Sequence, residues 1–149
     1  MTLGGSLLRY QKRFASLVAG LRGRYHADPL FASFSMLKVG DLYWQQLRVH
    51  AWQFWNGHLP DNQRAMLQRV DSVHGYATRS AGGGIHVGTR DHRSVGYRVP
   101  KEWAGLTAEE RGARSLAAFK RRSRDGFLRE YGLFACGALD CVVCEGWGP

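Results

Sequence analysis

Apolar residues recur at helical spacing near the start of the chain. Between Ser6 and Leu21, basic residues fall away from an apolar face formed by Leu7, Phe14, Val18 and Leu21. The pattern predicts an amphipathic helix that Ser6 caps and that ends near Gly20 and Gly23. A shorter helix is expected over 30–37, directly after an Asp-Pro pair.

The clearest helical segment is Asp41–Asn56. Asp41 is expected to cap its start, Gly57 stands where a left-handed residue is wanted, and Pro60 follows. Its apolar residues cover most sides: Tyr43, Leu47, Val49, Ala51, Trp52, Phe54 and Trp55. A helix of this kind is usually central in its fold. Another short helix is expected over 61–70.

The character changes between residues 71 and 100. The glycine run 82–84 breaks any helix and lacks the lysine pattern of a phosphate-binding loop, so we expect a flexible loop. Apolar and polar residues alternate at Ile85, Val87, Val95, Tyr97 and Val99. This alternation favours a small two-stranded ribbon that packs on the helices.

The last third returns to helical patterns. Residues 107–110 (TAEE) form a capping-box sequence. A helix is predicted from Ser115 to Tyr131, with an apolar side formed by Leu116, Phe119, Phe127 and Tyr131. We therefore predict a mainly α fold: one helical domain over 1–132, with a small β-ribbon or irregular glycine-rich insertion, and a cysteine-containing tail over 133–149.

Charge narrows the choice of partner. The 149 residues include 21 Lys and Arg against 12 Asp and Glu, a net charge of +9. Such an excess favours a polyanion, and arginine forms bidentate contacts with phosphate. The candidate nucleic-acid-binding residues are Lys120, Arg121, Arg122, Arg124, Arg79 and Arg93. The alternative is a solvated charged face without a ligand.

Catalytic patterns are missing from the sequence. Phosphoryl transfer by two metal ions needs paired carboxylates, and the adjacent pair Glu109-Glu110 is already assigned to a helix start. No nucleophile-elbow motif occurs. We therefore expect no catalytic residues, no small-molecule substrate and no enzymatic activity.

Three cysteines form a C-x4-C-x2-C cluster: Cys136, Cys141 and Cys144. Structural zinc usually needs four ligands, so a distant histidine such as His86 or His92 would have to complete the site. Reduced thiols without metal are the alternative. The sequence thus predicts no cofactor, with zinc on this cluster as the competing interpretation.

No segment approaches the roughly 20 apolar residues that cross a bilayer, and residues 1–20 lack a signal-peptide pattern. Three cysteines do not form a disulfide framework. We expect no membrane partner and a reducing compartment, either nucleus or cytoplasm.

Six short motifs follow one another along the chain: residues 8–13 (LRYQKR), 28–31 (DPLF) with 36–43 (MLKVGDLY), 54–60 (FWNGHLP), 73–79 (VHGYATR), 93–97 (RSVGY) with Trp103, and 115–120 (SLAAFK). In this order they resemble the region that follows the catalytic palm in reverse transcriptases of non-LTR (LINE-type) retrotransposons. Ala77, Ala104 and Thr107 depart from the family pattern.

The resemblance covers residues 8–131 and implies a thumb-like and post-thumb region. In that family the region helps to hold template RNA and target DNA, while the palm carries the catalytic carboxylates. The resemblance thus implies a non-catalytic fragment of a transposable-element protein that binds RNA or single-stranded DNA. The alternative is a structural or protein-interaction module, such as a decayed element remnant. The oligomeric state stays open.

Overall fold

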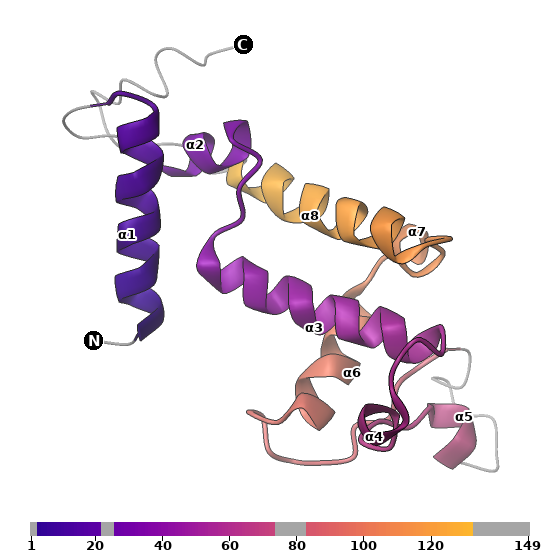
Figure 1. Cartoon of the computed structure of the whole chain (residues 1–149). Helices are drawn as coiled ribbons and strands as arrows, with labels where there is room; N and C mark the ends of the chain where they lie inside the picture. Colours follow the sequence, from indigo (N-terminus) through magenta and orange to yellow (C-terminus); the bar gives the residue numbers. More distant parts are fainter. Residues whose placement is uncertain (1–2, 22–25, 74–82, 133–149) are drawn as a thin grey trace. The chain divides into compact units, whose positions relative to one another are not determined.

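The computed structural model describes residues 3–21, 26–73 and 83–132 (Figure 1). Within these ranges the chain forms helices and no strand. The helices are α1 (Leu3–Val18), α2 (Asp28–Ser33), α3 (Val39–Trp55), α4 (Asp61–Arg64), α5 (Val70–Val73), α6 (Val95–Gly105), α7 (Ala108–Arg111) and α8 (Leu116–Gly132). The predicted mainly α fold is confirmed.

Residues cluster into two compact units. Unit 1 comprises Met1–Tyr43 and Arg124–Pro149, and unit 2 comprises Trp44–Ser123. Helices α3 and α8 each contribute residues to both units.

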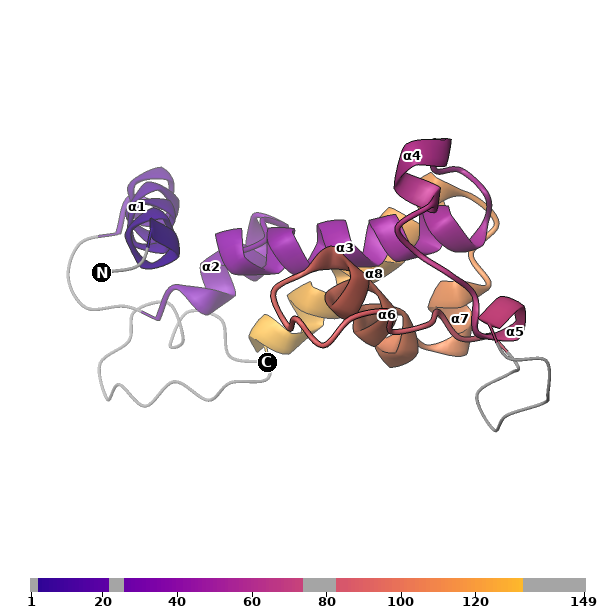
Figure 2. The same cartoon turned by 90° about the horizontal axis from the view of Figure 1, so that it is seen from below.

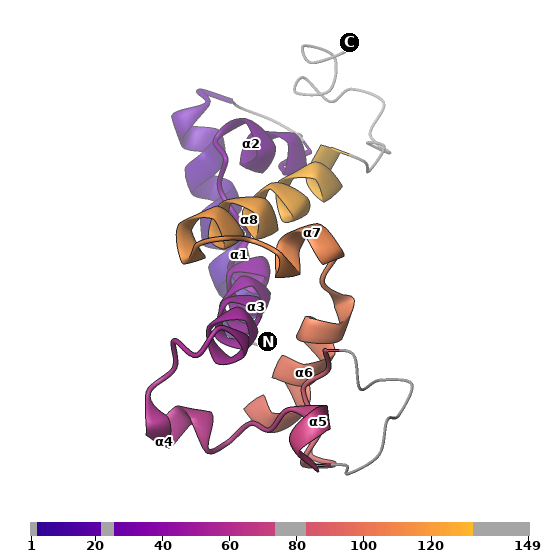
Figure 3. The same cartoon turned by 90° about the vertical axis from the view of Figure 1, so that its right-hand side faces the viewer.

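Unit 1 contains α1, α2, the first turn of α3 and the second half of α8. Figure 3 shows α2 beside α1. Its larger core cluster consists of Ala27, Phe31, Leu37, Phe127 and Tyr131. The side-chain amide of Gln11 in α1 donates to the Leu37 carbonyl at 2.6 Å and accepts from the Val39 N–H at 2.9 Å. These two bonds fasten α1 to the segment that leads into α3.

Three helix ends in the described chain use a left-handed residue. Gly20 (φ 68°), Ser35 (φ 48°) and Gly57 (φ 73°) follow α1, α2 and α3. After each, the next N–H bonds a carbonyl five positions back, as in the Schellman motif: Leu21 to Ser16, Met36 to Phe31, and His58 to Gln53. Ser35 is the unusual member because its Cβ makes this conformation costly.

The predicted helix starts were less accurate. α1 begins at Leu3, so Ser6 lies inside the helix and does not cap it. α3 begins at Val39, so Asp41 is the third helical residue rather than a cap. The carboxylate of Asp41 instead accepts a hydrogen bond from the Tyr131 hydroxyl, which also accepts the Lys38 N–H at 2.9 Å.

Unit 2 is built around α3. Trp52 (2% exposed), Ala51 and Phe54 face its core. In Figure 2, α6 lies in front of α3 and α8, and the core cluster joins residues of all three helices, including Val99 and Phe119. The central position predicted for α3 is therefore confirmed, although Tyr43 (44% exposed) and Trp44 (38% exposed) lie at the surface rather than in a core.

The predicted β-ribbon is wrong for the residues described. In the part of this region that the structure describes, an isolated bridge between Arg69 and Ile85 is the only strand-like pairing, and residues 83–94 are irregular apart from turns. Residues 95–105 form α6, because Val99, Trp103 and Leu106 recur at helical spacing and are buried. That periodicity outweighs the shorter alternation of Val95, Tyr97 and Val99.

The described end of the glycine run has a structural role. Gly83 has a positive φ of 136°, and its carbonyl accepts a hydrogen bond of 2.6 Å from the indole N–H of Trp103. Trp103 is 1% exposed and stacks on Trp55, with ring centroids 4.9 Å apart. A buried indole N–H needs an acceptor, and a backbone in this left-handed region brings the carbonyl to it.

Polar contacts complete unit 2. Thr107 and Glu110 form the predicted capping box at the start of α7. The guanidinium of Arg48 in α3 contacts the Glu102 carboxylate at 2.9 Å and the Glu110 carboxylate at 3.9 Å. Arg48 thus ties α3 to α6 and α7.

Candidate nucleic-acid interface

The first half of α8 presents cations because of its helical register. Ser115 caps the helix by accepting the Ala118 N–H at 3.2 Å, and Phe119 is fully buried in the unit 2 core. Each helical residue turns by about 100°, so Arg121 lies about 200° from Phe119 and faces solvent. Lys120 is exposed as well.

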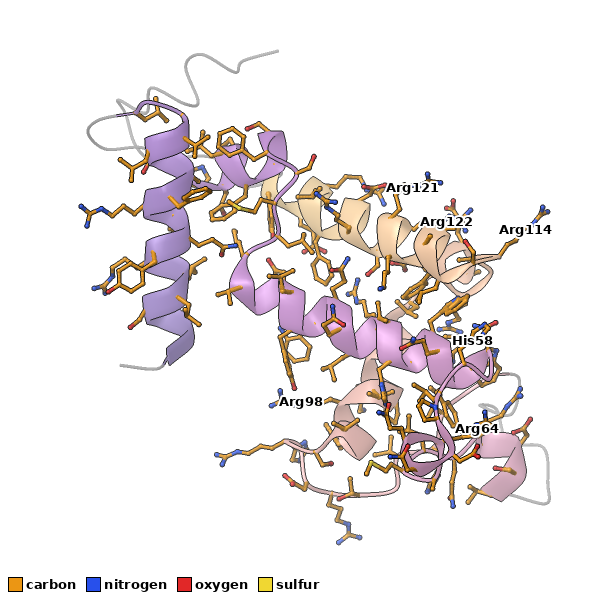
Figure 4. All side chains as sticks on the ribbon, in the orientation of Figure 1. His58, Arg64, Arg98, Arg114, Arg121 and Arg122 are labelled. Atoms are coloured by element: carbon orange, nitrogen blue, oxygen red, sulfur yellow. The ribbon has the colours of Figure 1, made fainter. Side chains whose placement is uncertain are left out.

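Three cations at this end of unit 2 are exposed and form no ion pair with any residue that the structure describes: Arg114, Lys120 and Arg121. Figure 4 shows the side chains of Arg114, Arg121 and Arg122 around the first turns of α8. We call Arg114, Lys120 and Arg121 the α8 cation group. Because the charges of this group are not neutralised by described carboxylates, they are available to a polyanion.

Arg122 differs from its neighbours. Its Nη1 donates to the Glu109 carbonyl at 2.6 Å, and its Nε lies 4.0 Å from the Glu109 carboxylate. The side chain is half-buried between α7 and α8. Arg122 therefore holds these two helices together, and only part of its hydrogen-bonding capacity remains for a phosphate.

Arg124, also predicted as a binding residue, belongs to unit 1. Its guanidinium donates to the carbonyl of Ser35, just after the end of α2. A cation at this position satisfies a carbonyl at the negative end of a helix. The structure thus gives Arg124 an intramolecular partner that the basic run in the sequence did not indicate.

Arg93 lies on an exposed turn before α6. Its backbone N–H donates to the Asp91 side chain at 3.0 Å, and the Ser94 hydroxyl donates to the Asp91 carbonyl at 2.8 Å. The exposed Arg93 guanidinium forms no ion pair with Asp91 or with any other described carboxylate. The Nε of Arg98 donates to the His92 carbonyl at 2.9 Å and holds the same turn.

Beside this turn lies a shallow hollow of about 480 Å³. Arg90 and two aromatic rings line it, with the ring centroids of His92 and Tyr97 4.2 Å apart in an edge-to-face arrangement. A cation next to aromatic rings is a combination that binds unpaired bases and their phosphates.

A second hollow of about 520 Å³ opens in unit 2 between the 83–87 segment and α6. Its basic lining residues are His86, Lys101 and Arg111, and none of the described residues that line it is a carboxylate. Pro100 and Ile85 form an apolar part of its wall. Lys101 and Arg111 could not be recognised as site residues from the sequence, since each stands alone beside a glutamate and only the fold brings the two together.

Charge is unevenly divided between the two units. Unit 2 contains 13 Lys and Arg against six Asp and Glu, whereas unit 1 contains eight against six. Seven of the nine net positive charges therefore belong to unit 2. Several unit 2 arginines are engaged internally, Arg48 with carboxylates and Arg69 over the Trp55 ring at 4.0 Å. Arg114, Lys120, Arg121 and Arg93 are exposed and form no ion pair with a described carboxylate, so they contribute to the exposed positive surface.

Some predicted site residues lie outside the described residues. They are Arg79, with its neighbour Tyr76, and the three candidate zinc ligands Cys136, Cys141 and Cys144. Among the described residues, no three His, Cys, Asp or Glu side chains come together as a metal site. The zinc interpretation stays a prediction about the tail.

None of the described helices combines the length and apolar character needed to cross a bilayer. The likeness to LINE-type reverse transcriptases rests on the six sequence motifs. No protein-family model, curated protein or solved structure matches the chain.

Proposed function

We propose that this protein binds RNA or single-stranded DNA without catalysing a reaction, through the positive surface of unit 2. The observation that carries the proposal is the α8 cation group, whose exposed side chains form no ion pair with a described carboxylate. Seven net positive charges on unit 2 add a long-range attraction for phosphates. The order of reverse-transcriptase-like motifs supports the same function.

Single strands fit the surface better than a regular duplex. Its cations come from a turn, a helix start and a hollow, rather than from one helix shaped for a groove. Aromatic rings adjoin Arg90, and every unpaired base offers a face for stacking. The hollow lined by Lys101 and Arg111 is about 520 Å³, a volume that falls within the range of small-molecule sites and suits one nucleotide.

The test is fluorescence anisotropy with labelled single-stranded RNA, single-stranded DNA and duplex DNA, each at low and near-physiological salt. The double variant Arg114→Glu with Arg121→Glu is expected to bind roughly tenfold more weakly or worse, a loss of about 1.4 kcal/mol or more. Its control is Arg9→Glu with Arg129→Glu, which changes the net charge equally but on unit 1.

Salt separates phosphate binding from other contacts. The logarithm of the binding constant should fall linearly with the logarithm of salt concentration, by about 0.7 per phosphate neutralised on a single strand. The α8 double variant should lower that slope, and the unit 1 variant should not. Absence of binding at low salt would overturn the proposal and leave a structural or protein-interaction module as the better account.

A further inference from the structure

Helix α1 carries an apolar stripe on its outer side. Its five side chains are all more than half exposed: Leu7 (52%), Tyr10 (69%), Phe14 (60%), Leu17 (71%) and Val18 (59%). At about 100° per residue they fill a continuous arc of about 100° that contains no polar residue. We call these five residues the α1 stripe.

If α1 were rotated about its axis so that the α1 stripe faced the rest of unit 1, more apolar surface would be buried within one chain. The side of α1 that packs on unit 1 carries Ala15 and Ala19, together with Leu8 and the hydrogen-bonding Gln11. The largest apolar side chains of the helix are therefore the ones left in solvent. Burying these side chains would remove their apolar surface from water, so a partner that covers the α1 stripe is favoured by the hydrophobic effect.

The spacing of the α1 stripe indicates which kind of partner fits. Leu7, Tyr10, Phe14 and Leu17 follow one another at intervals of three, four and three residues. This alternation is the seam of a two-stranded coiled coil, in which side chains from each helix insert between those of the other. Arg9 and Lys12 point away from the seam, whereas Arg13 lies beside it, so a like-charged helix can approach the seam most closely on the side away from Arg13.

We propose that the α1 stripe docks against the α1 stripe of a second copy of this chain. A two-fold pair needs one self-complementary patch, and a heptad seam satisfies that condition. With roughly 100 Å² exposed by each side chain, the pair would bury about 1,000 Å² in total, close to the lower bound for a specific interface. The resulting dimer is concentration-dependent rather than obligate.

An anionic membrane is the competing occupant, because α1 also contains Arg9, Lys12 and Arg13 and no acidic residue. A helix on a lipid surface repeats its apolar residues at the same intervals of three and four, so the width of the arc is the feature that distinguishes the two occupants. The arc of about 100° has the width of a stripe that a helix packs against protein, and this favours a second helix over a bilayer.

The experiment is sedimentation velocity and light scattering of the full chain, freed of nucleic acid, between about 5 and 200 μM, a range that brackets a micromolar dissociation constant. The expected mass rises from 16.7 kDa towards twice that value. Leu17→Glu and Phe14→Glu should both stay monomeric, with unchanged helical circular dichroism because both sites are exposed. Met66→Glu is the matched control: Met66 is 70% exposed, lies on unit 2, and should leave the dimer intact.

A wild-type chain that stays monomeric at the highest concentration would overturn the proposal, as would dimers that Leu17→Glu leaves unchanged. A second measurement tests co-sedimentation of the chain with vesicles of mixed neutral and anionic phospholipid. A monomer that sediments with these vesicles, and loses that ability in Phe14→Glu, would assign the α1 stripe to lipid. Since nucleic acid is absent throughout, this result is independent of the proposed binding activity.

Discussion

The hydroxyl of Tyr131, near the end of α8, donates a hydrogen bond to the carboxylate of Asp41 in the first turn of α3, 90 residues earlier in the chain. The same hydroxyl accepts the Lys38 N–H at 2.9 Å, and the Lys38 ammonium lies 4.3 Å from the centre of the Tyr131 ring. The ring itself is buried against Phe31. One side chain thus joins the core of unit 1 to its polar network.

Tyr131→Phe should lower the free energy of unfolding by about 1–3 kcal/mol, because it leaves the part-buried Lys38 N–H and the Asp41 carboxylate without their shared partner. Urea denaturation followed by circular dichroism measures the loss. Tyr10→Phe, at a site 69% exposed, is the control and should change stability little. Equal stability of the Tyr131 variant and the wild type would contradict this account of unit 1.

Alkaline pH provides a second test of Tyr131. Burial, followed by the hydrogen bond to Asp41, raises its pKa above the ordinary value of 10.0. The folded chain therefore keeps the phenol proton at a pH where the unfolded chain releases it. This contribution to stability is complete below pH 10 and is lost as the pH rises further. Tyr131→Phe should lose less stability between pH 9 and 11 than the wild type, in parallel denaturation series.

Ser35→Gly should stabilise the protein by about 1 kcal/mol, because Ser35 holds a left-handed φ of 48° that a side chain disfavours. Differential scanning calorimetry should show a higher melting temperature. Ser33→Gly is expected to have the opposite effect, since Ser33 lies in α2 and its hydroxyl donates to the Leu30 carbonyl at 3.0 Å. A lower melting temperature for Ser35→Gly would mean that the end of α2 differs from the structure.

Ser123→Ala should also raise stability, by about 1 kcal/mol. Ser123 is completely buried, and its hydroxyl has no hydrogen-bond partner among the described residues. Removing an unsatisfied buried hydroxyl removes its desolvation penalty. Ser16 is a matched control because it is 5% exposed and its hydroxyl donates to the Arg13 carbonyl at 2.9 Å. Urea midpoints should therefore rise for Ser123→Ala but not for Ser16→Ala.

His50 in α3 should make unit 2 sensitive to mild acid. Burial lowers the pKa of His50 below its ordinary value of 6.5. The unfolded chain then takes up this proton at a higher pH than the folded chain. The associated stability is present above pH 6.5 and is lost as the pH falls below it. His50→Gln should flatten the stability profile between pH 7 and 5, as measured by urea denaturation at each pH; a variant whose profile matches that of the wild type would refute this role for His50.

Patterns that depend on neighbouring residues were predictable from the sequence. The capping box of Thr107 and Glu110 and the left-handed Gly57 each involve contacts within a few positions, and both were confirmed. The long amphipathic runs of α3 and α8 were also found, because a helix buries residues three and four positions apart. The mainly α class follows from these local rules.

Helix starts and the 95–105 segment were harder to predict. Val95, Tyr97 and Val99 alternate like a strand, while Val99, Trp103 and Leu106 recur like a helix, and both patterns share Val99. Packing against Trp52 and Phe119 decided between them. Local sequence could not, because the residues that share a core with Val99 lie 47 positions before it (Trp52) and 20 positions after it (Phe119).

The sequence by itself determined that the chain forms helices and carries a large positive charge, since both depend on composition and short-range spacing. Only the tertiary structure decided which cations remain available. Arg124 reaches the carbonyl of Ser35, 89 residues away, and Arg122 contacts Glu109, whereas Arg114 and Arg121 contact no described carboxylate. The physical reason is that the effective charge of an arginine depends on the groups that the fold places within a few ångströms of it.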